Sequence, residues 1–275
     1  MSKRWGESVA AHVAVIGLAC VFFLPFLWML GTAVKPDNDI FLYPPKWIPS
    51  VWQFSNFANA WAKAPFARFY FNSVVVTAAI ALIQLTTAAL AAYAFARLQF
   101  PGKSMLFVSY LLVMMIPNQV TLIPNFITLK TLGMLNTYWA LILPFVATGF
   151  GTFLIRQYFL SIPQELFDAA VVDGAGHLRI LWTICVPIAG PAFATFGLLT
   201  TMWHWNDFFW PLIVTSSPQM RTLPLGLVVF TNSEQGTSWN FLMAAGIFTA
   251  LPIVLLFLFA QRHFVQGVAR VGIKG

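Results

Sequence analysis

Few side chains in this sequence have the types and spacing that chemistry would need. His204 and Asp207 are three residues apart, so one helix face could carry both, as a proton relay would require. Relays normally lie deep in a bilayer, however, and this pair falls at the end of an apolar run, so we interpret it as a polar helix end near the outer mouth. The other histidines, His12, His177 and His263, are too scattered to form a metal or nucleophile site. We therefore expect a protein that is not an enzyme.

A second apparent motif is Gly102-Lys103-Ser104, which resembles the end of a phosphate-binding loop. Such a loop needs the pattern G-x-x-x-x-G-K-[ST] after a strand. Here Arg97 stands at the first glycine position, and the preceding segment is an apolar helix-like run. The two cysteines also lack metal-ligand spacing. We expect no cofactor or metal site in this chain.

The composition points to a bilayer as the solvent. The chain has 275 residues, of which 59% are hydrophobic and only 8% charged, whereas soluble domains run near a quarter charged. The first apolar run, 10–33, is longer than the core of a signal peptide, so we expect it to remain as a span. An all-α, polytopic membrane bundle is predicted, with six transmembrane helices near 12–33, 69–95, 104–122, 137–156, 187–207 and 241–260. The third is expected to be interrupted near Pro117 and Pro124.

Lysine and arginine indicate the orientation of these spans. With the N-terminus inside, nine basic residues fall in the inner segments and six in the longer outer segments. This excess predicts that both termini and the segment 161–191 are cytoplasmic. The net charge of +7 is then explained by basic residues at span ends, and no nucleic-acid partner is expected.

The second span combines small and neutral polar residues. Ala88, Ala92 and Ala96 recur at every fourth position, a spacing that lets helix backbones approach closely in lipid. We therefore expect this span at the centre of the bundle. Uncharged polar side chains within or beside spans could either bridge helices or line a water-filled path. The candidates for lining a pathway are Asn72, Gln84, Asn118, Gln119 and Asn206.

The segment 161–191 is a polar island between two apolar runs. Ser161 followed by Gln164 is the spacing of a capping box at a helix start, and Pro163 suits a first helical turn. Ala169 and Ala170 would give a smooth face for close approach, and Gly174 would allow the chain to turn. A second helix is expected over 177–187, leading into the fifth span. The segment is predicted to be a docking element.

At these residues the sequence resembles a known family. Residues 168–175 read D-A-A-V-V-D-G-A, with Ile184 and Pro187 downstream, which is similar to the "EAA" signature of permease subunits of bacterial ABC importers. Asp168 replaces the usual Glu, and Val186 stands where Leu is usual. The Trp205-Asn206-Asp207 and Trp210-Pro211-Leu212 blocks and the ending 261–275 resemble the carbohydrate branch, in particular the maltose-type second permease subunit.

The resemblance implies a type I importer permease fold in the bacterial cytoplasmic (inner) membrane, crossing it several times. It divides the chain into a segment 1–68, with the first span and an outer loop, and a permease core 69–275 with a cytoplasmic coupling loop 159–186. The implied coupling residues are Glu165, Asp168, Ala169, Ala170, Asp173, Gly174, Ala175 and Pro187.

The implied partners are a second permease, two ATPase subunits that bind ATP and Mg, and an extracytoplasmic solute-binding protein. The expected cargo is a carbohydrate, namely an oligosaccharide, a disaccharide or a sugar derivative. One alternative is an anionic polyol such as glycerol 3-phosphate. A less favoured alternative is a proton-coupled secondary transporter.

Overall fold

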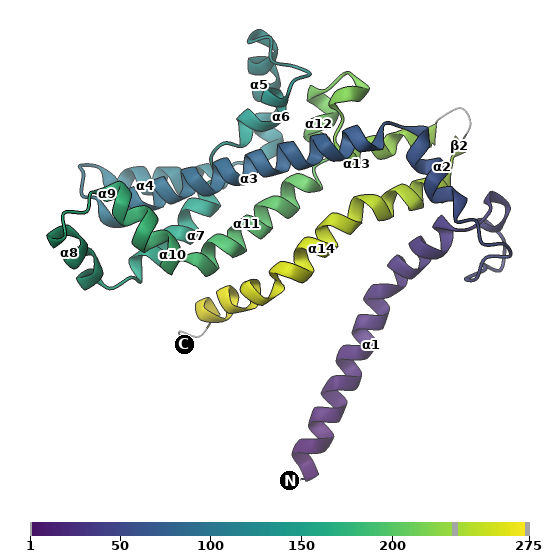
Figure 1. Cartoon of the computed structure of the whole chain (residues 1–275), viewed down its shortest axis with the longest axis horizontal. Helices are drawn as coiled ribbons and strands as arrows, with labels where there is room; N and C mark the ends of the chain where they lie inside the picture. The colour runs from purple at the N-terminus through teal and green to yellow at the C-terminus, as the bar shows by residue number, and fades with distance from the viewer. Residues whose placement is uncertain (1, 233–235, 273–275) are drawn as a thin grey trace. The chain divides into compact units, whose positions relative to one another are not determined.

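The computed structural model describes residues 2–232 and 236–272, with side chains described over 11–231 and 236–261. Almost all of this part is helical (Figure 1). Three helices in it are long and apolar enough to cross a membrane, and three bent pairs of helices bring the number of spans to six if each pair counts as one. The predicted six-span, all-α organisation is therefore confirmed.

The three long helices match three predicted spans closely. They are α1 (Ser2–Ala33), α3 (Phe66–Arg97) and α14 (Trp239–Gly272). Their apolar stretches are Ala11–Ala33, Phe66–Arg97 and Trp239–Gln261. The agreement is close because a span is set mainly by the length of an uninterrupted apolar run.

The other three spans are bent, and only one of the bends was expected. Helices α4 (Lys103–Val113) and α5 (Asn118–Thr131) meet at 93° around Pro117, as predicted, but Pro124 lies inside α5 and does not break it. A 46° bend separates α6 (Tyr138–Ile142) and its 3-10 turn (Leu143–Phe145) from α7 (Gly149–Leu160). An 81° bend separates residues His177–Ile188 from α11 (Gly190–Trp205).

Short helices, turns and strands occupy the loops between the spans. They include α2 (Ser55–Lys63), α12 (Phe209–Val214), α13 (Leu223–Gly226), and the 3-10 turns Asp37–Asp39, Pro218–Met220 and Leu227–Phe230. Two-residue strands β1 (Thr231–Asn232) and β2 (Gly236–Thr237) pair antiparallel. The outer loop that follows the first span thus contains the helix α2, on which Asn56 and Ala60 are buried.

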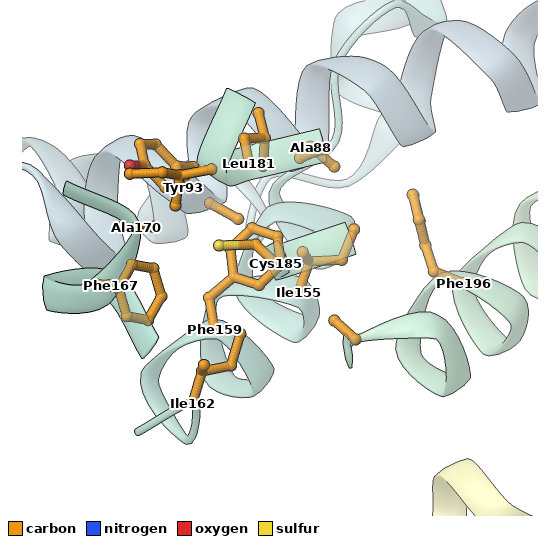
Figure 2. Packing of buried hydrophobic residues seen from close by; sticks show 14 residues of the cluster. Ala88, Tyr93, Ile155, Phe159, Ile162, Phe167, Ala170, Leu181, Cys185 and Phe196 are labelled. Atoms are coloured by element: carbon orange, nitrogen blue, oxygen red, sulfur yellow. The ribbon is translucent and has the colours of Figure 1, made fainter. Parts of the chain in front are cut away.

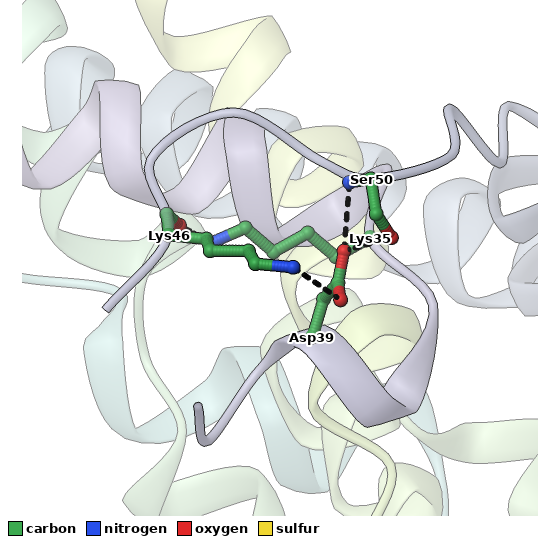
Figure 3. A network of polar contacts seen from close by, with 4 residues as sticks. All are labelled: Lys35, Asp39, Lys46 and Ser50. Atoms are coloured by element: carbon green, nitrogen blue, oxygen red, sulfur yellow. Dashed lines mark hydrogen bonds and ion pairs between the residues drawn. The ribbon is translucent and has the colours of Figure 1, made fainter. Parts of the chain in front are cut away.

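By internal contacts the chain forms two compact units, 1–66 with 226–251, and 67–225 with 252–275. The division at residue 68 inferred from the sequence stays a prediction. In the first unit, the loop after α1 is closed by polar contacts (Figure 3). The Lys35 ammonium, fully buried, donates to the Lys46 carbonyl oxygen and lies 4.1 Å from the Trp28 ring centroid. The Asp39 carboxylate accepts from the Ser50 backbone N–H at 2.7 Å.

In the second unit, α3 is the central helix, as its small residues predicted. Ala88 and Ala92 are buried, and so are Thr77 and Ala81, which lie nearer the start of the helix. Ala88 and Ala92 belong to a cluster that also contains Ile155 and Phe159 of α7 (Figure 2). A second cluster, nearer the start of α3, packs Val76 and Ile80 against residues that include Leu141, Trp210 and Val214. The small side chains thus let α7 and its neighbours approach the α3 backbone.

Candidate coupling loop and polar cluster

The helix at the centre of the predicted coupling loop (residues 159–186) is α8 (Gln164–Val172). The expected capping box is not formed. Ser161 has helical backbone angles and ends α7, and its hydroxyl donates to the Tyr158 carbonyl at 2.8 Å. Pro163, with ψ at 140°, precedes α8 and is not part of its first turn. The spacing Ser-x-x-Gln predicted a helix start, but this serine closes the preceding helix.

The turn after α8 is built as the sequence predicted. Gly174 has φ at +74°, the left-handed region that glycine adopts without steric cost. The Gly174 N–H donates to the Val171 carbonyl at 3.0 Å, and the Ala175 N–H donates to the Ala170 carbonyl at 2.9 Å. These two bonds define a Schellman motif, which satisfies the last carbonyls of a helix.

The two faces of α8 differ in exposure. Phe167 and Ala170 are buried and belong to the cluster formed with Tyr93, Phe159 and Cys185 (Figure 2). Ala169 is exposed, so the two adjacent alanines do not form one smooth face as expected. The outward side carries the acids Glu165, Asp168 and Asp173 together with Val171 and Val172. The helix therefore presents a mixed acidic and apolar surface on a well-packed back.

Two side chains from the end of α3 hold this loop in place. The Arg97 guanidinium lies 3.8 Å from the Phe167 ring centroid, and its Nη2 donates to the carbonyl oxygens of Phe159 and, at 2.7 Å, Ile162. The Tyr93 hydroxyl and His177 Nδ1 are 3.1 Å apart. Because α3 is the central helix of its unit, these contacts attach the coupling loop to the core as well as to its neighbours in sequence.

The end of the loop is helical over His177–Ile188, as predicted, but the helix contains a π turn that was not expected. A short α9 (His177–Ile180) leads into a π-helical turn (Leu181–Cys185) and a final turn, α10 (Val186–Ile188), that contains exposed Pro187. Proline has no N–H for the helical ladder, so the π turn before it accommodates the missing bond. The chain then bends sharply at Ala189 into α11.

The neutral polar residues of α3 bind the broken fourth span. The Gln84 amide nitrogen donates to the Phe145 carbonyl at 2.8 Å, and the Thr87 hydroxyl donates to the Val146 carbonyl at 2.8 Å. Both carbonyls lie at the bend between α6 and α7, where the helical ladder is interrupted. Gln84 Oε1 also accepts from the Thr200 hydroxyl. The amide of Gln84 is thus engaged on both sides within the chain.

His204 joins this cluster, which corrects its predicted place at the outer mouth. Its Nε2 is 3.3 Å from the Gln84 amide nitrogen, and its ring centroid is 4.9 Å from that of Phe145. Its Nδ1 is buried without a hydrogen-bond partner. Gln84 lies near the middle of α3, so the imidazole sits well inside the membrane-spanning part. We call Gln84, Thr200 and His204 the polar cluster.

The remaining pathway candidates lie on several separate elements. The Asn72 amide nitrogen donates to the carbonyls of Gln219 and Arg221 at 2.7 and 2.8 Å, and its oxygen accepts from the Tyr138 hydroxyl. Asn118 and Gln119 are exposed at the start of α5. Asn206 is exposed and donates to the Met202 carbonyl at 2.8 Å. Their assignment to a pathway stays a prediction.

Asp207 has a structural partner, and its place near the outer mouth stays a prediction. Its carboxylate accepts from the Trp210 N–H at 3.2 Å, in the first turn of α12. An acid at a helix N-terminus also suits the helix dipole. The carboxylate is thus explained by the start of the next helix.

Comparison with known proteins is consistent with this architecture. Residues 84–270 match the family described as the inner membrane component of binding-protein-dependent transport systems. The chain is 40% identical over 278 residues to the probable ABC transporter permease protein YurM of Bacillus subtilis, covering 99% of this chain and 91% of that protein.

Two further relatives match over nearly their full length. The chain is 34% identical to the sn-glycerol-3-phosphate permease UgpE of Yersinia enterocolitica, covering 98% of both chains. It is 33% identical to the arabinooligosaccharide permease AraQ of Halalkalibacterium halodurans, covering 99% of this chain and all of that one.

A solved structure shares the fold. A chain of a bacterial ABC transporter involved in the import of the acidic polysaccharide alginate superposes with a TM-score of 0.83 at 23% identity, covering 96% of this chain and 98% of that one. The six-span arrangement with its bent helices is thus the type I importer permease fold. The chain belongs to the family of inner-membrane components of binding-protein-dependent transport systems. It is a permease subunit of an ABC importer, a transport component of the inner membrane.

Proposed function

We propose that this permease forms a translocation pathway with a second, different permease, and that α8 docks into a cytoplasmic ATPase subunit. Each of two ATPases would bind ATP and Mg and close on the other, and a binding protein would deliver the solute from outside. Closure would draw the docked helices together and turn the pathway outward. A short helix held firmly against the core suits this task, because it passes on rigid-body motion.

The observation that carries this proposal is the contrast between the two faces of α8. Its back is buried through Phe167 and Ala170, while Glu165, Asp168 and Asp173 stand exposed beside Val172, which is 86% exposed. An exposed apolar side chain ringed by acids on a packed helix is typical of a docking surface. The coupling residues proposed are Glu165, Asp168, Ala169, Ala170, Asp173, Gly174, Ala175 and Pro187.

Charge reversal tests the docking surface. Asp173→Lys is expected to leave insertion into the membrane intact but to weaken ATPase binding and uncouple ATP hydrolysis from transport. Asp37→Lys is the matched control, because Asp37 is equally exposed but lies in the loop after α1. If Asp173→Lys assembles with the ATPase and transports normally, the docking proposal is wrong.

For the cargo, we propose a neutral sugar, most simply an oligosaccharide. AraQ, at 33% identity, carries arabinooligosaccharides. In the described second unit, the cluster at mid-span consists of uncharged Gln84 and Thr200 with His204, and the basic residues of α3 stand at its two ends, Arg68 and Arg97. A pathway for an anion would favour a cation at mid-depth.

An anionic polyol is the second candidate, because the permease UgpE, at 34% identity, carries sn-glycerol 3-phosphate. The two candidates are separated by the ATPase activity of the reconstituted complex with its binding protein. Neutral arabinooligosaccharide is expected to stimulate the activity and glycerol 3-phosphate to leave it at the basal level. Stimulation by glycerol 3-phosphate alone would establish the anionic cargo.

The same preparation excludes or establishes secondary transport. Uptake into vesicles is expected to require ATP and to persist when a protonophore collapses the proton gradient. Uptake that continues without ATP and stops with the protonophore would overturn the importer mechanism. The Asp207→Asn variant is expected to behave as the unchanged protein in this assay, because its carboxylate caps α12.

A further inference from the structure

We propose that Arg97 is the positioning residue that fixes the coupling loop to α3, so that displacement of α8 moves the central helix directly. The inference rests on the proposed docking of α8 to an ATPase. Sequence order connects the coupling loop only to α7 on one side and to α11 on the other. The geometry adds a third attachment, to α3, in which the Arg97 guanidinium holds the N-terminal half of the loop and the Tyr93 hydroxyl contacts His177.

The contacts of Arg97 converge on the N-terminal half of the coupling loop. Its Nη2 donates to the carbonyl oxygens of Phe159, the last turn of α7, and Ile162, the residue before Pro163. Its Nη1 donates to Gln164 Oε1 at 3.1 Å, and Gln164 Nε2 donates in turn to Asp168 Oδ1 at 2.9 Å. The end of α7, the linker and the first turns of α8 are therefore held by one side chain.

The guanidinium is needed for this arrangement because of its shape. It lies 3.8 Å from the centre of the Phe167 ring, whose side chain is only 5% exposed. A flat cation can stack on a ring with its face while its edge donates several hydrogen bonds, which a lysine ammonium cannot do. Ser161 and Pro163 around the linker form no side-chain cap with α8, so its first turn gains its fixed position from Arg97 and from the burial of Phe167.

A second arginine, which also contacts the end of α3, offers a matched control. Arg156 of α7 also stacks on a phenylalanine, with its guanidinium 4.1 Å from the Phe107 ring centroid. Its Nε donates to the Phe95 carbonyl at 3.1 Å. Arg156 thus joins α7 to α3 and α4 with the same chemistry but makes no described contact with α8. Arg156→Lys therefore removes the same kind of stacked guanidinium, with one hydrogen bond where Arg97 has three, and leaves the contacts of α8 in place.

The test compares Arg97→Lys with Arg156→Lys in the complete reconstituted complex. Two quantities are measured, the binding of the ATPase subunit and the number of solute molecules transported per ATP hydrolysed. Arg97→Lys is expected to bind the ATPase normally but to lower the transport-to-hydrolysis ratio by about tenfold, the scale of one lost charge-assisted hydrogen bond. Arg156→Lys is expected to keep the ratio of the unchanged protein. A normal ratio in Arg97→Lys, or an equal loss in both variants, would overturn the proposal.

A milder variant keeps the test decisive if Arg97→Lys does not assemble. Gln164 is exposed, so Gln164→Ala is expected to fold and to lower the ratio by a smaller factor, because it removes only the link from Arg97 through to Asp168. An unchanged ratio in Gln164→Ala would contradict the proposal. Asp173→Lys distinguishes failure of the docking proposal from failure of the Arg97 proposal. If it binds and couples normally, the docking surface is wrong; if it uncouples while Arg97→Lys does not, only the Arg97 joint is wrong.

Discussion

A cation helps to hold each of two loops, the buried Lys35 in the loop after α1 and the half-buried Arg97 in the coupling loop. The two cations connect different parts of the chain. The Lys35 ammonium lies over the Trp28 ring and donates to the Lys46 carbonyl, 11 residues away. Arg97 stacks on Phe167 and donates to groups 62, 65 and 67 residues away. The first contact closes a loop on itself, and the second joins distant parts of the chain.

The difference shows which loop is held by its own residues and which loop is held by a distant helix. The loop around Lys35 is also closed by Asn56, whose amide donates to the carbonyls of Ala33 and Lys35, each at 3.0 Å. Loss of one contact there leaves the ends of the loop in place. The coupling loop is also held by more than one contact, but Arg97 and Tyr93 both come from α3, so these contacts connect the loop to the central helix.

Removal of the aromatic ring under each cation is expected to give the largest difference in stability between the two loops. Phe167→Ala is expected to destabilise the complex by about 3–5 kcal/mol, because it empties a buried site in the cluster of Figure 2. Trp28→Ala is expected to cost less, because Trp28 is only half-buried. Thermal unfolding of the purified complex in detergent measures both. An equal loss in the two variants would show that the two anchors are alike.

The turn of the coupling loop should show the next largest effect. Gly174→Ala is expected to cost about 1–2 kcal/mol, because alanine is strained in the left-handed region. Gly176→Ala is the matched control, since Gly176 has φ at −74° and open space where a β-carbon would stand, and it should change stability little. The same unfolding assay applies, and equal losses would mean that the backbone angle is not the cause.

The Tyr93 contact should contribute about 1 kcal/mol. Tyr93→Phe keeps the buried ring and removes only the hydroxyl that lies 3.1 Å from His177 Nδ1. A double-mutant cycle with His177→Ala isolates the pair. Additive effects of the two substitutions would show that this contact does not help to hold the coupling loop.

The smallest effect is expected in the loop after α1, as a dependence on pH. Hydrogen bonds from the Ser50 hydroxyl and N–H, with a smaller contribution from Lys46, hold the pKa of Asp39 below its usual range, against the effect of burial. The stabilisation is therefore complete above the usual carboxyl range and is lost as the pH falls through the lowered pKa.

Proteolysis of the loop in oriented vesicles would report this change. Cleavage is expected to increase at acidic pH, and Asp39→Asn is expected to remove that dependence. Asp37→Asn serves as the control, because Asp37 is exposed. A pH dependence that persists in Asp39→Asn would assign it to another group.

The positions of the spans could be predicted from the sequence because apolar length alone sets them. The role of Arg97 could not, because a basic residue at a span end is equally well explained by the orientation of the protein. The prediction for Ser161 was wrong because a serine three residues before a glutamine also fits the last turn of the preceding helix. The contacts of Arg97 join residues far apart in the sequence, whereas the error at Ser161 is a local ambiguity, because its hydroxyl bonds to Tyr158 three residues earlier.

His204 was misplaced for a different reason. The sequence suggested a span over 187–207 with its end at the outer surface. The bend at Ala189 leaves α11 only 16 residues, which rise about 24 Å against a hydrocarbon core of about 30 Å. α11 alone is therefore shorter than the hydrocarbon core, and His204 in its last turn meets the middle of α3. The Gly190-Pro191 pair at this point is a local turn signal, but it does not report an angle of 81°.

The contacts of Gln84 and Thr87 with the interrupted fourth span have a mechanical consequence. If α3 slid past that span, the carbonyls of Phe145 and Val146 would lose their donors in a medium without water, at a cost of several kcal/mol each. The two hydrogen bonds thus hold the two spans in register.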